Sequence, residues 1–355
     1  MADETLRQLE RDWDQDPAAL ERAISARRRM GIPVPRRFLM ARRLHSVKRP
    51  DAYSVFYYAP RSSYDQTLAW KATWVPEHWL WGVRIEHCPD DARRATWRSL
   101  LAQHAVPAVS LNESDDALLE ALEGLPLRAL CLNTRTTWSA RGWQAVLALS
   151  DLEALDLRAR AFRPTVETFA ELARLPNLTS LHLEGELLYS TKLESLGPGL
   201  AELPRLTHLS LKQVSVGDGR DLAALRDMRY LEELELQGPL RDADLAAVAS
   251  CPALRTLRLY KVDGITNAGL AELRGTRLEQ VHVSDCPGIR AGHRVGCPRC
   301  GGTIPPPPPE PAPSRPSLPP TGGDYEWVQV TTSSSQTCPS CTTVYRNTSQ
   351  TTYDL

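Results

Sequence analysis

Four cysteines near the C-terminal end of this 355-residue chain have the spacing of metal ligands. They form two CxxC pairs, CPRC and CPSC, and the four residues are Cys297, Cys300, Cys338 and Cys341. Four thiolates suit a tetrahedral zinc ion, and glycines after the first pair permit the tight turn that a metal knuckle needs. The residues therefore predict structural zinc, one ion per chain, with iron and a metal-free tail as the alternatives.

The segment around these cysteines has to position them. Residues 305–320 hold ten prolines, which predicts a polyproline-like spacer without a core of its own, although its PxxP spacing also fits a ligand of aromatic grooves. The stretches at 325–330 and 342–346 alternate like strands. Knuckles and strands together resemble a zinc ribbon over about 293–347, and the resemblance implies that the four cysteines are its ligands.

Composition and charge restrict the function classes. A formal net charge of −1 gives no attraction of the whole chain to nucleic acid or membrane, and 42% hydrophobic residues are ordinary for a globular protein. No apolar run approaches the ~20 residues of a membrane helix, and the start lacks a signal peptide's apolar segment. We therefore expect a cytoplasmic protein. Its bias towards arginine, alanine and proline indicates a GC-rich, bacterial genome.

An internal repeat organises the middle of the chain. The pattern apolar-x-x-apolar-x-apolar occurs nine times, and its third apolar residue falls at positions 85, 111, 132, 157, 183, 211, 236, 259 and 283. Spacings of 21 to 28 residues predict one short strand plus one helix or turn per repeat. Helical segments are expected between the strands, for example at 90–105, 167–176 and 244–252.

These repeats resemble the leucine-rich repeat family over about 80–290. The resemblance implies an α/β solenoid with a curved parallel sheet inside and helices outside. The copy at 257–273 is similar to the ribonuclease-inhibitor-like, cysteine-containing class, in which Cys or Asn follows the third apolar residue by three positions. Cys88 and Cys286 fit this class, whereas the other copies carry different residues there.

The segments ahead of the repeats are expected to be helical and then aromatic. Two amphipathic helices are predicted first, at 3–13 and 17–31, with Pro17 at a helix start and Gly31 at a stop. The following aromatic stretch is expected to cap the first repeat, with an aromatic ligand pocket as the alternative. The expected parts are an N-terminal helical segment, a cap, about nine leucine-rich repeats, and the zinc ribbon with its proline-rich insert, at residues 1–35, 36–79, 80–290 and 291–355.

The polar positions of the strands predict a binding face. Side chains alternate along a strand, so the residues between the leucines point to the concave face, with small residues in the first half and charged or aromatic ones in the second. An area on the order of 600 Å² approaches one side of an ordinary protein interface. We predict a non-enzymatic scaffold for a protein partner, bound by Asp156, Arg158, His182, Glu184, His208, Lys212, Glu233, Glu235, Arg258, Tyr260 and His282.

Other interpretations of the same residues stay open. The concave side chains could be merely solvated, or His182 and His208 with nearby carboxylates could form an acid–base or metal cluster. No nucleophile elbow, phosphate loop or HExxH motif accompanies them. Cys131 is expected to face outward and to be exposed. The arginine-rich residues 21–50, with the zinc ribbon, offer an alternative function in nucleic-acid association, and an anionic membrane or acidic partner is open there too.

Overall fold

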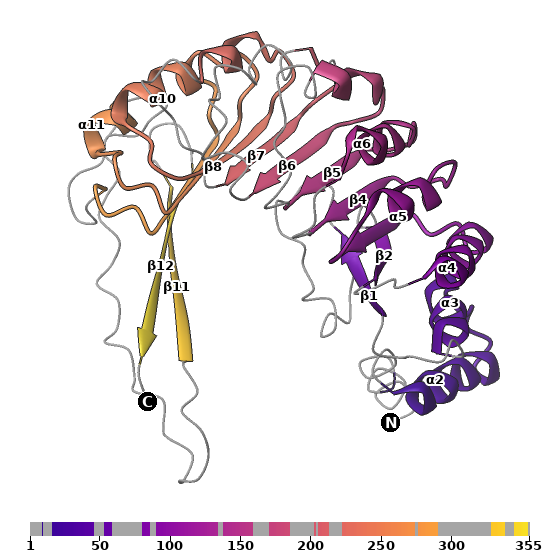
Figure 1. The fold of residues 1–355 in the computed structure, drawn as a ribbon. Coiled ribbons are helices and arrows are strands. Elements are labelled where there is room, and N and C mark those ends of the chain that lie inside the picture. The colour runs from indigo at the N-terminus through magenta and orange to yellow at the C-terminus, as the bar shows by residue number, and fades with distance from the viewer. Residues whose placement is uncertain are drawn as a thin grey trace, which may run out of the picture. The chain divides into compact units, whose positions relative to one another are not determined.

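The computed structural model is drawn in Figure 1. It divides into two units, which are described one at a time. The first consists of Met1–Leu187 and Leu203–Leu206, and the second of Leu188–Glu202 and Thr207–Leu355. The structure describes residues 9, 16–45, 53–58, 80–85, 90–133, 138–158, 170–184, 202–203, 205–212, 222–273, 276–289, 328–337 and 344–353.

Apart from residue 9, the described part of the first unit begins with the helices α2 (Pro17–Arg29) and α3 (Arg36–His45). The helix predicted over 3–13 lies outside the described residues except for residue 9, and α3 lies in the segment predicted as the cap. The side chain of Asp16 caps α2 by accepting a hydrogen bond from the Ala18 backbone amide at 2.8 Å, and proline occupies the first helical turn. Gly31 follows with φ +67°, a conformation that glycine adopts without strain. The predicted start and stop of this helix are therefore confirmed.

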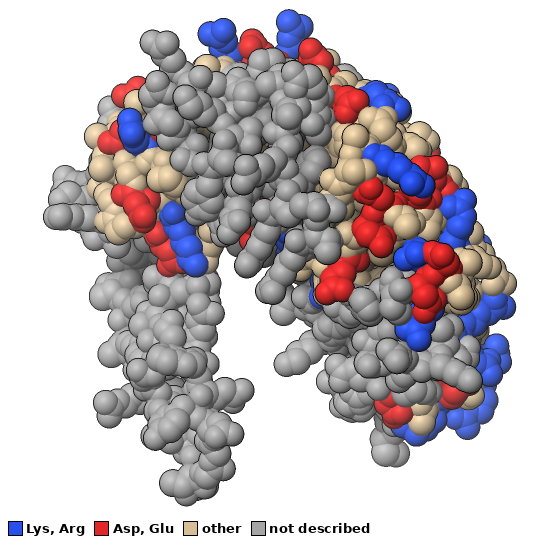
Figure 2. Space-filling view, viewed as in Figure 1, with Lys and Arg blue, Asp and Glu red and all other residues tan. Residues whose placement is uncertain are grey.

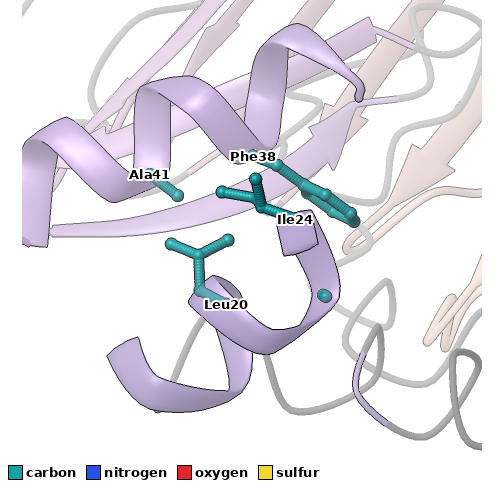
Figure 3. Packing of buried hydrophobic residues seen from close by; sticks show 5 residues of the cluster. Leu20, Ile24, Phe38 and Ala41 are labelled. Atoms are coloured by element: carbon teal, nitrogen blue, oxygen red, sulfur yellow. The ribbon is translucent and has the colours of Figure 1, made fainter. Parts of the chain in front are cut away.

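The two helices pack on each other through a small apolar core (Figure 3). Leu20 and Ile24 lie one helical turn apart on α2 and meet Phe38 and Ala41 of α3, and all four side chains are buried. Trp81, which comes from the first repeat, packs against the same cluster. The helix pair is thus joined to the repeats by apolar contact.

The remainder of the first unit is a ladder of short strands. Strand β1 (Tyr53–Tyr58) pairs antiparallel with β2 (Leu80–Ile85), and every later pairing in the unit is parallel. The later strands are β3 (Ala108–Leu111), β4 (Ala129–Leu132), β5 (Ala154–Leu157) and β6 (Ser180–Glu184). The helices on one face are α4 (Asp91–Gln103), α5 (Asp116–Ala121) and α6 (Ala140–Leu147), followed by the 3-10 helix η3 (Leu172–Arg174) (Figure 1).

The second unit continues the same pattern and ends differently. Its parallel strands are β7 (His208–Lys212), β8 (Glu233–Gln237), β9 (Thr256–Tyr260) and β10 (Gln280–Ser284). The intervening helices are η4 (Ala223–Asp227), α10 (Asp242–Ala249) and α11 (Asn267–Ala271). Beyond β10, strand β12 (Val344–Tyr353) pairs parallel to β10, and β11 (Val328–Thr337) pairs antiparallel to β12.

The nine predicted repeat strands are present as β2 to β10, and their ladder leucines are buried. This confirms the α/β leucine-rich-repeat architecture within each unit. The helix predicted at 167–176 is described from residue 170 onward. Residues 170–171 are α-helical, and the next three residues form the 3-10 helix η3. The strands predicted at 325–330 and 342–346 correspond to β11 and β12, which begin three and two residues later. Both strands are longer than predicted, because they pair with each other along their full length.

Adjacent helices on the outer face are joined by a carboxylate. Asp116, at the start of α5, accepts a hydrogen bond from the backbone amide of Ser139 at 2.9 Å and another from its hydroxyl, just where α6 begins. Asp242 at the start of α10 does the same for Thr266, whose backbone amide and hydroxyl each donate at 2.6 Å. One acidic side chain thus satisfies helix-start donors of the next repeat.

Candidate interaction surface

The face of the sheet opposite the helices, called the ladder face here, carries the predicted binding residues. In the first unit much of this face is buried. Ala108, Ala129 and Ala154 form a buried apolar cluster with Leu80, so their small size does not leave an open groove. The residues two positions further along each strand point to the same face and are buried as well; they are Ser110, Cys131, Asp156 and His182. The prediction that this thiol is exposed is therefore wrong.

Four predicted residues meet on β5 and β6 of the first unit. Asp156 pairs with His182 in the strand register, and Arg158 and Glu184 follow two positions later on the same side. The guanidinium of Arg158 donates to both carboxylate oxygens of Asp156 at 2.7 to 3.2 Å and lies 3.8 Å from Glu184. The Nε2 atom of His182 lies 3.2 Å from Glu184 and 3.8 Å from Asp156.

Two members of this cluster are buried, and the other two, Arg158 and Glu184, are 24% and 32% exposed. Asp156 is 1% exposed and His182 is 3% exposed. Burial by itself lowers the pKa of Arg158, but the charge and hydrogen bonds of Asp156, together with the charge of Glu184, outweigh it and raise the pKa. The charges therefore compensate one another, while Nδ1 of His182 is buried without a hydrogen-bond partner among the described residues.

The second unit presents a different ladder face. Glu233 on β8 lies between two basic side chains: its carboxylate oxygens are 3.4 Å from Nε2 of His208 and 2.7 Å from the Arg258 guanidinium. Burial raises the pKa of Glu233, but the hydrogen bonds and charges of His208 and Arg258 outweigh it and hold the pKa at about 2. Side-chain exposure of 27% for Glu233 and 35% for Arg258 leaves both within reach of solvent.

Strand β9 also carries an aromatic group. Tyr260 is partly exposed, and the ammonium of Lys261 lies 5.0 Å from its ring centroid, a cation–π geometry. Lys261 has φ +49°, and it is exposed in the turn after the strand. Sequence reasoning missed this lysine because its side chain follows the strand, outside the alternating positions. Next to Arg258 and Tyr260 lies the partly exposed His282 on β10.

Other predicted residues of the second unit are enclosed. Lys212 and Glu235 are both buried and form an ion pair at 3.8 Å, and His208 is buried too. The structure therefore brings Glu233, Arg258 and Tyr260 together on an accessible face. Their assignment to partner binding stays a prediction.

The predicted zinc ligands and the proline-rich segment lie outside the described residues. The second cysteine pair belongs to residues 338–343, which connect β11 to β12. Within the described part of the chain, no group of three or more His, Cys, Asp or Glu side chains is placed to hold a metal ion. In the same described part, no helix is long and apolar enough to cross a membrane. The expectation of a non-enzymatic protein stays a prediction.

Comparison with known proteins gives only distant similarities. No protein-family model matches the chain. An internalin of Listeria monocytogenes is 17% identical with a TM-score of 0.35, over 50% of this chain and 46% of that one. Internalin C2 of the same organism is 21% identical with a TM-score of 0.34, over 52% and 74% of the two chains. A Drosophila Toll–Spatzle complex matches at 13% identity and a TM-score of 0.42, over 61% and 33%. The fold assignment therefore rests on the strand registers of this chain.

Proposed function

We propose that the chain is a non-enzymatic scaffold that binds a protein partner on the ladder face of the second unit. The observation that carries the proposal is the pair Arg258 and Tyr260 on one strand, both partly exposed. Arginine and tyrosine are enriched among the residues that contribute most to protein interfaces. Side chains two positions apart on a strand point to the same side, so one partner can contact both.

Both anchors are held in place before binding. The Arg258 guanidinium is fixed by its 2.7 Å hydrogen bond to Glu233, and the Tyr260 ring is covered by Lys261. A side chain that is already ordered loses less conformational entropy in a complex. The mixture of acidic and basic groups on this face fits a protein surface better than a nucleic-acid backbone, which selects cations.

Substitutions on the second unit test the proposal. The unsubstituted chain, immobilised on a resin and exposed to an extract of the native organism, should retain a partner. The purified partner should then be titrated against the chain and its variants. We expect Arg258→Ala and Tyr260→Ala each to weaken its affinity about thirtyfold, because truncating an anchor costs about 2 kcal/mol. Arg226→Ala on η4, an exposed arginine of the same unit, is the matched control and should leave affinity unchanged.

The opposite result would place recognition elsewhere. If Arg226→Ala abolishes binding while Tyr260→Ala and Arg258→Ala leave the affinity intact, the ladder face of the second unit is not the binding surface. Circular dichroism of each variant separates a loss of contact from a loss of fold.

The finer family features belong to the proposal as well. The Cys286 thiol is buried, with its sulfur 3.3 Å from the Ser284 carbonyl oxygen, and burial raises the pKa of the thiol. In the corresponding place of an earlier repeat, the Ser114 hydroxyl is buried and accepts a hydrogen bond from the Trp138 indole at 3.0 Å. A buried polar atom at this position supports the cysteine-containing class of repeats, with serine substituting in one copy.

The C-terminal cysteines complete the proposed architecture. We assign them one structural zinc ion per chain, in a ribbon that caps the repeats or offers a second docking site. Two CxxC pairs in one tail are the observation behind this assignment. Metal analysis of the purified chain should find about one zinc per chain. Zinc-free protein with four freely reactive tail thiols would contradict it.

A further inference from the structure

The helix pair α2–α3 carries a concentration of positive charge. Residues 16–43 contain eight arginines and only two carboxylates, an excess of six positive charges. Both carboxylates are already used: Asp16 pairs with Arg22 at 3.2 Å, and Glu21 pairs with Arg42 at 2.5 Å. Figure 2 shows Lys and Arg side chains gathered over this part of the molecule. Residues 16–43 contain no further carboxylate.

Three of these arginines flank the loop between the helices. Arg28, Arg29 and Arg36 are exposed, and among the described residues they form no ion pair. Arg36 also acts on the residue that follows helix α4: burial first, and then the charges of Arg43 and Arg36, lower the pKa of His104.

The same loop exposes an apolar side chain. Met30 is 44% exposed, and the only other exposed large hydrophobic residue among those described is Tyr230 in the second unit. The loop is fixed in this position, because the Arg27 guanidinium donates to the Pro33 carbonyl oxygen at 2.9 Å and lies 5.5 Å from the Phe38 ring centroid. Met30 is thus exposed in a loop that begins and ends with exposed arginines.

We propose that the α2–α3 loop, residues 28–36, docks the chain onto an anionic lipid surface. Met30 enters the boundary between headgroups and acyl chains, while the arginines around it bind lipid phosphates. An exposed methionine close to exposed arginines matches such a boundary, where apolar acyl chains meet negatively charged headgroups. A nucleic-acid backbone would use the arginines and aromatic platforms, and it has no use for an exposed methionine.

Co-sedimentation of the full chain with lipid vesicles tests the proposal. We expect binding to phosphatidylcholine vesicles that contain phosphatidylserine, none to phosphatidylcholine alone, and weaker binding as salt is added. Each arginine near an anionic surface strengthens partitioning about fivefold. The triple variant Arg28→Gln, Arg29→Gln, Arg36→Gln should therefore lose on the order of a hundredfold. Met30→Ser should lose about tenfold at unchanged charge.

A matched variant separates local from total charge. Replacing three other exposed arginines, Arg174, Arg226 and Arg229, by glutamine removes the same charge and should leave vesicle binding unchanged. The loop substitutions are all on the surface, so the melting temperature should not change either.

Four results would overturn the proposal. The first is equal binding to vesicles with and without phosphatidylserine, and the second is no binding to either. The third is an equal loss in the matched variant. The fourth is binding of single-stranded RNA that needs the loop arginines, ignores Met30→Ser and occurs without vesicle binding, in which case the surface is a nucleic-acid site.

Discussion

The ladder faces of the two units follow one repeat pattern but differ in access. In the first unit, the column that precedes the central polar one is occupied by Ala129 and its alanine neighbours, and it is buried. In the second unit the same column carries the buried His208 and Thr256, but also Glu233, which is partly exposed, and Gln280, which is exposed. The leucines build the strand ladder in both. The residues between the leucines decide whether its polar face is closed or accessible.

The charged groups differ in the same way. In the first unit, Arg158 binds the buried Asp156, and the Arg158 side chain is 24% exposed. In the second, Arg258 binds Glu233, and the two side chains are 35% and 27% exposed. The difference lies in the acceptor: Asp156 is enclosed and contributes to the fold, whereas Glu233 is also within reach of a partner.

The largest expected difference between the two units is the loss of stability when a lysine is placed in the same column of each ladder face. Ala129→Lys forces a long cation into a buried apolar cluster, so we expect the free energy of unfolding to fall by about 4 kcal/mol. Gln280→Lys adds the same side chain at an exposed position and should change it by less than about 0.5 kcal/mol. Urea denaturation measures both. Equal costs would mean that the two faces are equally open.

Removing one carboxylate from each network should have a smaller effect. Asp156→Ala leaves Arg158 without its main partner in a mostly buried site and should cost about 3 kcal/mol. Glu233→Ala releases the more exposed Arg258 and should cost about 1 kcal/mol. Thermal unfolding provides the comparison. The double variant Asp156→Ala, Arg158→Ala should recover part of the first loss, and its failure to do so would show that the pair is not coupled.

The smallest expected effect is on the stability of the second unit's charge network in acid. The pKa of Glu233 is lowered from 4.5 to about 2 in the folded chain, so its stabilising contribution is complete above pH 4.5 and is lost as the pH falls towards 2. We expect Glu233→Gln to flatten this part of the stability profile by about 1–2 kcal/mol. The control Glu272→Gln, on the same unit, should leave the profile unchanged. A profile unaffected by Glu233→Gln would contradict the ion pairs with His208 and Arg258.

The sequence was sufficient to predict the strands of the repeats and the first helix. Leucine spacing specifies which residues enter the core, and Pro17 and Gly31 specify where α2 begins and ends. These signals are local and do not depend on distant parts of the chain.

Side-chain access could not be predicted in the same way. The alternation of a strand says to which side Cys131 or Asp156 points, and it does not say what surrounds that side. Arg158 lies against Asp156 in the structure and encloses it, which depends on a side-chain conformation rather than on spacing. The cation–π contact of Lys261 likewise arises from a turn with positive φ, for which lysine gives no sequence signal.

The carboxylate bridges between outer helices have a consequence for how the array opens. Asp116 completes the first turn of the next helix, and a side chain at Gly142 would collide with that carboxylate. If α5 frays, the Ser139 amide loses its acceptor in the same event, so opening passes from one repeat to its neighbour. Amide hydrogens at the starts of α5 and α6 should therefore exchange with solvent together, as a single cooperative step.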